Sequence, residues 1–98
     1  MNRETNADLR TLGAVITKKS KTTWAIERTV NAVCLATIAK VAERAFVGRV
    51  TLDGRDITTP VYKRLDDVVH ACLAPHLGAE RGEKWAFPAP DANDWLYE

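Results

Sequence analysis

The sequence predicts a mainly α protein with a small β-hairpin (an α+β fold), built from three helices and an aromatic C-terminal tail. Two observations lead to this fold class. Apolar residues recur at helical spacing over three stretches, which is the pattern of amphipathic helices. An Asp53-Gly54 pair lies between two short stretches of alternating polarity, and this pair favours a type I′ hairpin turn. The hairpin is expected between the second and third helices, with the second helix long and central.

The first helix is predicted over residues 6–16. Asn6 is a suitable N-cap, because its side-chain oxygen can accept a hydrogen bond from the first turn. Leu9, Leu12 and Ile16 then form one apolar stripe. A helix of this length depends on packing that stripe against the rest of the chain.

The second helix is predicted over residues 23–46, with a threonine as its N-cap. Its apolar positions at helical spacing are Ile26, Val30, Val33, Cys34, Ile38, Val41 and Ala45. Its centre, residues 32–39, is apolar on almost every side, so it needs cover on both sides. The rest of the chain or a second copy has to supply this cover, and we expect a homodimer through this helix.

The hairpin is predicted over residues 47–58. Val50 and Leu52 alternate with Arg49 and Thr51, as in a strand with one buried face. Two strands alone are only marginally stable, so the hairpin has to pack on a helix or pair with another strand.

The third helix is predicted over residues 60–74. Thr59 is a suitable N-cap, and Pro60 fits the first helical position, where no N–H is needed. Pro75 is expected to end the helix. The side chains expected to face inward are Val61, Leu65, Val68, Val69 and Cys72.

The last part of the chain, residues 79–98, has little periodicity but is rich in aromatic and acidic residues. The residues expected to bind a partner are Trp85, Asp91, Asp94, Trp95 and Tyr97. Tryptophan and tyrosine contribute much of the energy of protein interfaces, and carboxylates steer a basic partner. A second interpretation stays open, in which these aromatics close the protein's own core.

Composition places the chain among ordinary globular domains. Its 98 residues suit one domain, residues 1–98, with 46% hydrophobic and 28% charged residues. No apolar run approaches the roughly 18–20 residues needed to cross a bilayer. The polar N-terminus lacks the hydrophobic segment of a signal peptide. We therefore expect a cytoplasmic protein without a membrane partner.

No motif indicates catalysis, a cofactor or a metal. The five glycines are scattered singly, so there is no glycine-rich phosphate loop. Cys34 and Cys72 are interpreted as two buried, reduced thiols on separate helices. His70 would face away from Cys72 on a helix, which argues against a shared metal. We expect no enzyme, no catalytic residues, no metal and no cofactor.

Charge is divided unevenly along the chain. Residues 1–49 hold nine Lys or Arg against four Asp or Glu, a net charge of +5, whereas residues 50–98 carry −4. The total of +1 therefore hides a basic first half. The residues that could contact nucleic acid are Lys18, Lys19, Lys21 and Arg28, in a basic loop spanning residues 18–28.

These observations predict a non-enzymatic interaction protein that binds a macromolecular partner, in the first place a protein. In size and in its lack of motifs, the chain resembles the small accessory proteins of phages and mobile elements, including inhibitors such as anti-CRISPR proteins. The resemblance is one of kind and assigns no residues. The alternative is a small DNA-binding regulator that uses the basic loop.

Overall fold

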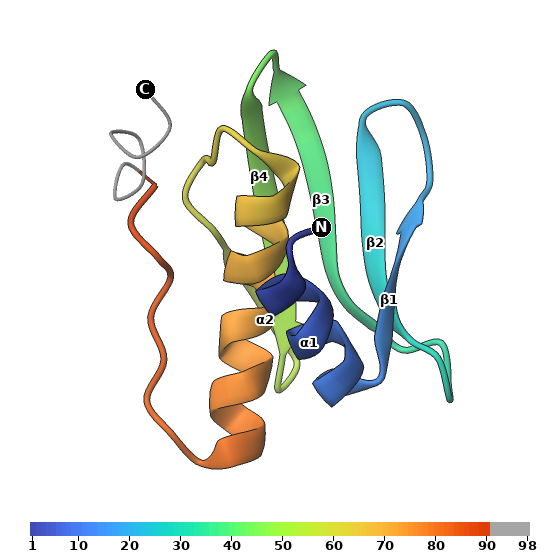
Figure 1. Ribbon diagram of the computed structural model, residues 1–98, viewed down its shortest axis with the longest axis vertical. Helices are drawn as coiled ribbons and strands as arrows, with labels where there is room; N and C mark the ends of the chain where they lie inside the picture. The colour runs from blue at the N-terminus through green and yellow to red at the C-terminus, as the bar shows by residue number, and fades with distance from the viewer. Residues whose placement is uncertain (91–98) are drawn as a thin grey trace.

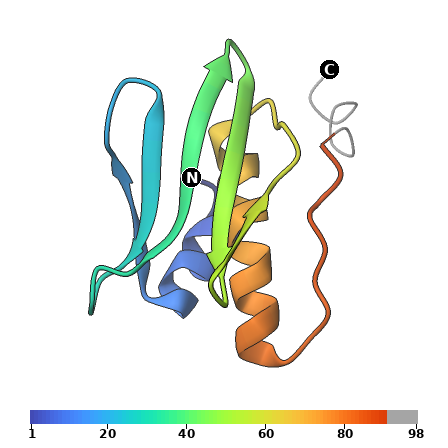
Figure 2. The same ribbon diagram turned by 180° about the vertical axis from the view of Figure 1, so that it is seen from behind.

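The computed structural model of the protein, described over residues 1–90, has two layers, an antiparallel sheet and two helices on one of its faces (Figures 1 and 2). The elements are α1 Arg3–Leu12, β1 Ala14–Lys18, β2 Thr23–Arg28, β3 Cys34–Ala42, β4 Ala45–Leu52, β5 Arg55–Thr58 and α2 Leu65–Arg81. The five strands lie in chain order, and each is antiparallel to its neighbours. The fold is thus α+β with a large sheet, and the prediction of a mainly α protein with three helices is wrong. Neither helix in residues 1–90 is long and apolar enough to cross a membrane.

The long helix predicted over residues 23–46 is replaced by β2, β3 and the first residues of β4. Successive residues alternate between the two faces of the sheet in the ladder register, as strand residues do, and burial does not follow the helical period. Ile26 and Ile38 are fully buried, but Val30 is 94% exposed and Val41 is 60% exposed. A single helical stripe would have buried all four, so the predicted helix is wrong, and the homodimer expected through it stays an untested prediction.

The core lies between the sheet and α2. One row of side chains crosses all five strands and faces the helices, since residues directly opposite each other in a ladder share a face. This row consists of Ile16, Ile26, Ala36, Val50 and Ile57. α2 covers it with fully buried Val68, Val69, Cys72 and Leu73.

Helix α1 begins and ends earlier than the predicted 6–16. Its N-cap is Asn2, whose Oδ1 accepts a hydrogen bond from the Thr5 N–H at 2.8 Å. Gly13 follows the helix in the left-handed conformation, with φ of 62°, and this geometry ends the helix. Ile16, predicted in the helix, therefore lies in β1.

Helix α2 starts later and ends later than the predicted 60–74. Tyr62 pairs with Phe46 in an isolated β-bridge, which holds the preceding segment extended. Pro75 lies inside the helix and does not end it. Proline removes one hydrogen-bond donor, but buried side chains such as Leu73 and Leu77 lie on both sides of it. Their burial outweighs the lost hydrogen bond, so the helix continues.

The hairpin predicted around Asp53-Gly54 is confirmed. Leu52 pairs with Arg55 across the turn, and the whole of β5 pairs with residues 49–52 of β4. Both turn residues have positive φ, 52° for Asp53 and 75° for Gly54, as a type I′ turn requires.

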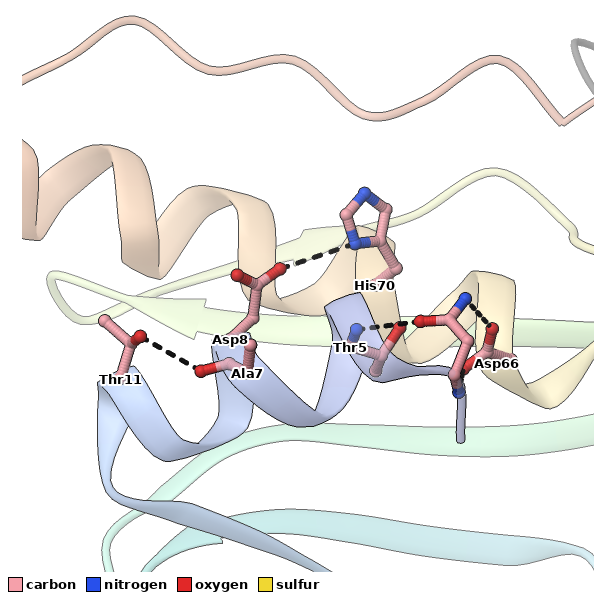
Figure 3. Close-up of polar contacts among 7 residues, drawn as sticks. Thr5, Ala7, Asp8, Thr11, Asp66 and His70 are labelled. Carbon is pink, nitrogen blue, oxygen red and sulfur yellow. Dashed lines mark hydrogen bonds and ion pairs between the residues drawn. The ribbon is translucent and has the colours of Figure 1, made fainter.

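Contacts between α1 and α2 join the N-terminal end of the chain to its second half (Figure 3). The backbone N–H of Asn2 donates to the Asp66 carboxylate at 3.1 Å, and the Asn2 side-chain amide donates to the same carboxylate. Further along, Asp8 Oδ2 lies 3.6 Å from His70 Nδ1. These contacts hold α1 against α2 on the helix-covered face of the sheet.

Candidate functional site

The face of the sheet opposite the helices is open, and Figure 2 views the molecule from this side. Its central row of side chains also crosses all five strands: Thr17, Ala25, Thr37, Arg49 and Thr58. Small and β-branched residues fill most of this row, and a single long cationic side chain stands among them. An antiparallel sheet commonly leaves one face to solvent, so the character of that face decides whether it can bind anything.

A pocket of about 540 Å³ is hollowed into this open face. We call it the sheet-face pocket; its lining includes Lys19, Ala25, Glu27, Cys34, Thr37, Ala39, Arg49 and Thr58. Ala25 is only 5% exposed although it faces away from the helices. Short side chains on β2 and β3 therefore form a floor, and longer ones rise on either side of it.

The charges around the sheet-face pocket do not cancel completely. On one side, Lys19 Nζ lies 3.1 Å from Glu27 Oε1, so these two charges neutralise each other. On the other side, the Arg49 guanidinium is exposed and forms no hydrogen bond or ion pair within residues 1–90. The pocket thus carries one uncompensated positive charge, which favours an anionic group on a ligand.

The two cysteines have different environments. Cys72 is buried in the core as predicted, whereas Cys34 is exposed at the start of β3 and lines the sheet-face pocket. The prediction that both thiols are buried on helices is therefore wrong for Cys34. Burial raises the pKa of Cys72 to about 12, because the thiolate would lose its hydration.

This difference predicts selective thiol chemistry. In the native protein at pH 7.5, Cys34 should react readily with a maleimide, and Cys72 should react at least about 100-fold more slowly, since the thiolate is the nucleophile. Mass spectrometry of labelled peptides measures both rates, and both thiols should react alike in denaturant. Equal rates in the native protein would contradict the buried position of Cys72.

The structure does not gather the four basic residues predicted to contact nucleic acid. Lys18 extends over Trp24 on the helix-covered side, with Nζ 5.8 Å from the ring centre, whereas Lys19 pairs with Glu27 at the pocket. Lys21 is exposed in the turn between β1 and β2. Arg28 lies at the far end of β2, where Nη1 donates to the Leu12 carbonyl at 3.0 Å. Neighbouring strand residues point to opposite faces, so these cations do not form one patch.

The predicted partner-binding residue Trp85 packs against the protein itself. A Cβ added at Gly78 of α2 would lie 2.8 Å from Trp85 Cδ1, so the indole lies directly on the helix. Trp85 also meets Phe87 edge-on, with ring centres 5.1 Å apart, and the Tyr62 hydroxyl donates to the Pro88 carbonyl at 2.6 Å. The other predicted partner-binding residues, Asp91, Asp94, Trp95 and Tyr97, lie outside the described residues.

Comparisons with protein-family models, curated proteins and solved structures find no match to this chain. The candidate site is therefore assigned from geometry. Within residues 1–90, no three His, Cys, Asp or Glu side chains gather as metal ligands would. The sheet-face pocket instead offers a shaped surface, one unpaired cation and an exposed thiol.

Sequence analysis missed the residues that form this pocket. Thr37 and Arg49 attract no attention alone, because threonine is common in strands and an arginine is common on any surface. The available signal was alternation: Trp24 and Ile26 lie on the helix-covered side, and Ala25 lies between them on the open side. Assigning this stretch to a strand would have separated the two faces.

Proposed function

We propose that this protein acts without catalysis, by binding a protein partner through the open face of its sheet. The observation that carries the proposal is the sheet-face pocket. Its volume of about 540 Å³ falls within the range of about 300–1,000 Å³ that is typical of ligand pockets. The floor belongs to hydrogen-bonded central strands, so the site is held in shape before a partner arrives. Such binding suits an inhibitor or an accessory protein.

The character of the open face favours a protein over nucleic acid. Sheets that bind single-stranded nucleic acid present aromatic rings for stacking and several cations for the phosphates. Here Trp24 and Phe46 pack against the core, and the lysines are divided between the two faces. DNA binding by the basic loop is therefore the weaker candidate, and the experiment below separates the two.

The composition of the central strand, β3, favours a partner that covers the open face of the sheet. Residues 32–39 are apolar except for Thr37, and in β3 one side of this stretch is buried beneath α2. The other side, with Thr37 and Ala39, faces the pocket. The requirement for two-sided cover, which we assigned to a helix from the sequence, applies to this strand.

Site-specific photo-crosslinking tests the proposal with Cys34 as the handle. A benzophenone maleimide on Cys34 should form adducts with a protein in an extract of the source cells. The matched control carries the label on an exposed helix position, in the variant Cys34→Ser with Glu80→Cys, and should not form the same adduct. Mass spectrometry identifies the adduct, and nuclease treatment tests for nucleic acid.

Competition shows whether the adduct depends on the pocket. Unlabelled wild-type protein should suppress it, whereas the Thr37→Trp variant, with its pocket filled, should not. Thr11→Trp, on the exposed surface of α1, should compete like wild type. A nuclease-sensitive adduct, an adduct with a second copy of this chain, or equal competition by both tryptophan variants would overturn the proposal. Circular dichroism confirms that each variant is folded.

A further inference from the structure

We propose that the sheet-face pocket recognises an acidic side chain of its protein partner, with the carboxylate bound by Arg49 between the hydroxyls of Thr37 and Thr58. This inference rests on the proposed function, that a protein docks on this face, and it names the chemistry of the docking group. The three residues are direct neighbours across the sheet, on β3, β4 and β5. Directly opposite residues have Cβ atoms about 4.5–5.5 Å apart, so the two threonine side chains flank the base of the Arg49 side chain.

Charge within the pocket selects an anion. Lys19 and Glu27 neutralise each other, and the Asp56 carboxylate, which accepts a hydrogen bond from the Thr51 hydroxyl at 3.0 Å and keeps its charge, does not line the pocket. Arg49 has no such partner within residues 1–90. A guanidinium offers several N–H donors in a planar fork that matches a carboxylate, and paired bonds of this kind are among the stronger ones at interfaces.

The shape of the pocket indicates a protein segment as the source of that carboxylate. Ala25 and Ala39 form an apolar floor, against which the methylene groups of a glutamate can pack. A volume of about 540 Å³ is much larger than one carboxylate, so it also accommodates residues on either side. The Thr37 and Thr58 hydroxyls can donate to the carboxylate oxygens that Arg49 leaves free.

The test uses the full-length protein labelled with ¹⁵N and two synthetic peptides. Acetyl-(Ala-Glu)₃-amide is the acidic probe, and acetyl-(Ala-Gln)₃-amide is its neutral counterpart of nearly the same shape. Titration followed by NMR should shift the amide signals of Thr37, Arg49 and Thr58. The acidic peptide should bind at least about tenfold more tightly than the neutral one, and glutarate, a free dicarboxylate, should bind more weakly than the peptide.

Variants assign the preference to Arg49. Arg49→Gln should remove the tenfold difference between the two peptides, and Arg49→Lys should restore only part of it, since lysine lacks the planar fork. Arg10→Gln, an exposed change on α1, should leave the difference unchanged. A difference that persists in Arg49→Gln, or that also disappears in Arg10→Gln, would overturn the inference.

The remaining outcomes are also decisive. Equal binding of both peptides, or no shift with either at millimolar concentration, contradicts acidic recognition. Glutarate binding as tightly as the acidic peptide would assign the pocket to a free carboxylate and overturn a protein segment as the source. The Cys34 crosslinking experiment detects a docked protein whatever its charge. A pocket-dependent adduct without acidic preference therefore overturns this inference alone, and failure of both experiments overturns both proposals.

Discussion

Replacing Ile38 with alanine is expected to lower the free energy of unfolding by about 2–5 kcal/mol, the range for removing a large aliphatic side chain from a core. Ile38 is 1% exposed on the central strand, between Trp24 and Gly48 in the register. β3 is hydrogen-bonded to a strand on each side, and a helix packs across the sheet. The neighbouring side chains therefore have little freedom to move into the cavity that Ile38→Ala leaves. The upper part of that range is therefore expected, measured by urea unfolding.

Val30→Ala is the matched control, since it removes methyl groups from the tip of the loop between β2 and β3. Val30 is 94% exposed, so its replacement should change the free energy of unfolding by no more than about 0.5 kcal/mol. If residues 23–46 formed one helix, Ile38 and Val30 would lie on the same buried stripe. Similar losses for the two variants would therefore contradict the sheet.

The Gly48→Ala variant should lose about 1–3 kcal/mol or more, because the methyl group has no room. A Cβ added at Gly48 would lie 2.4 Å from Cys72 Sγ and 3.2 Å from Thr59 Cγ2. The Cys72 side chain lies on a helix pressed against the strand, so neither element can move far. Urea unfolding gives the loss relative to wild type.

A double-mutant cycle identifies the contact responsible. Cys72→Ala removes the sulfur atom, so Gly48→Ala should cost less free energy in that background than in wild type. Cys34→Ala, which changes the exposed thiol, should instead add independently to Gly48→Ala. Additivity with Cys72→Ala as well would show that the sulfur does not cause the crowding.

The parts of the fold that could be predicted carry local chemical signals. Asp53-Gly54 marks a turn in which both residues need positive φ, and no tertiary contact is required to recognise it. The two other non-glycine residues with positive φ in residues 1–90, Ala32 and Arg44, carry no such signal. They turn the chain after β2 and after β3, and without them the stretch from 23 to 46 reads as one uninterrupted element.

In residues 23–46, apolar residues from separate strands and a loop happen to lie at the spacing of a helix, which led to the prediction of one helix. Ile26, Val30 and Val33 lie at helical spacing, yet Val30 and Val33 belong to an exposed loop. The β-branched content of this stretch, including Thr37 and Ile38, favoured strands. Three strands with half-buried faces place apolar residues closely enough to imitate one helix that is apolar on every side.

The candidate site could not be predicted because it exists only across strands. Thr37, Arg49 and Thr58 are far apart in the sequence and become neighbours through the register of β3, β4 and β5. The basic loop shows the reverse case, in which neighbours in the sequence are separated on the surface. Lys18 and Lys19 are adjacent in the sequence but point to opposite faces of the sheet.

The order of the strands along the chain also bears on how the molecule folds. β4 and β5 meet across the two residues Asp53 and Gly54, and the other neighbouring strands are joined by similarly short connections. Closing such short loops costs little entropy. The contact of Asn2 with Asp66 spans 64 residues, so closing this loop costs more entropy than closing the strand connections. We therefore expect α1 to dock late in folding, so that its contacts slow unfolding more than they speed folding.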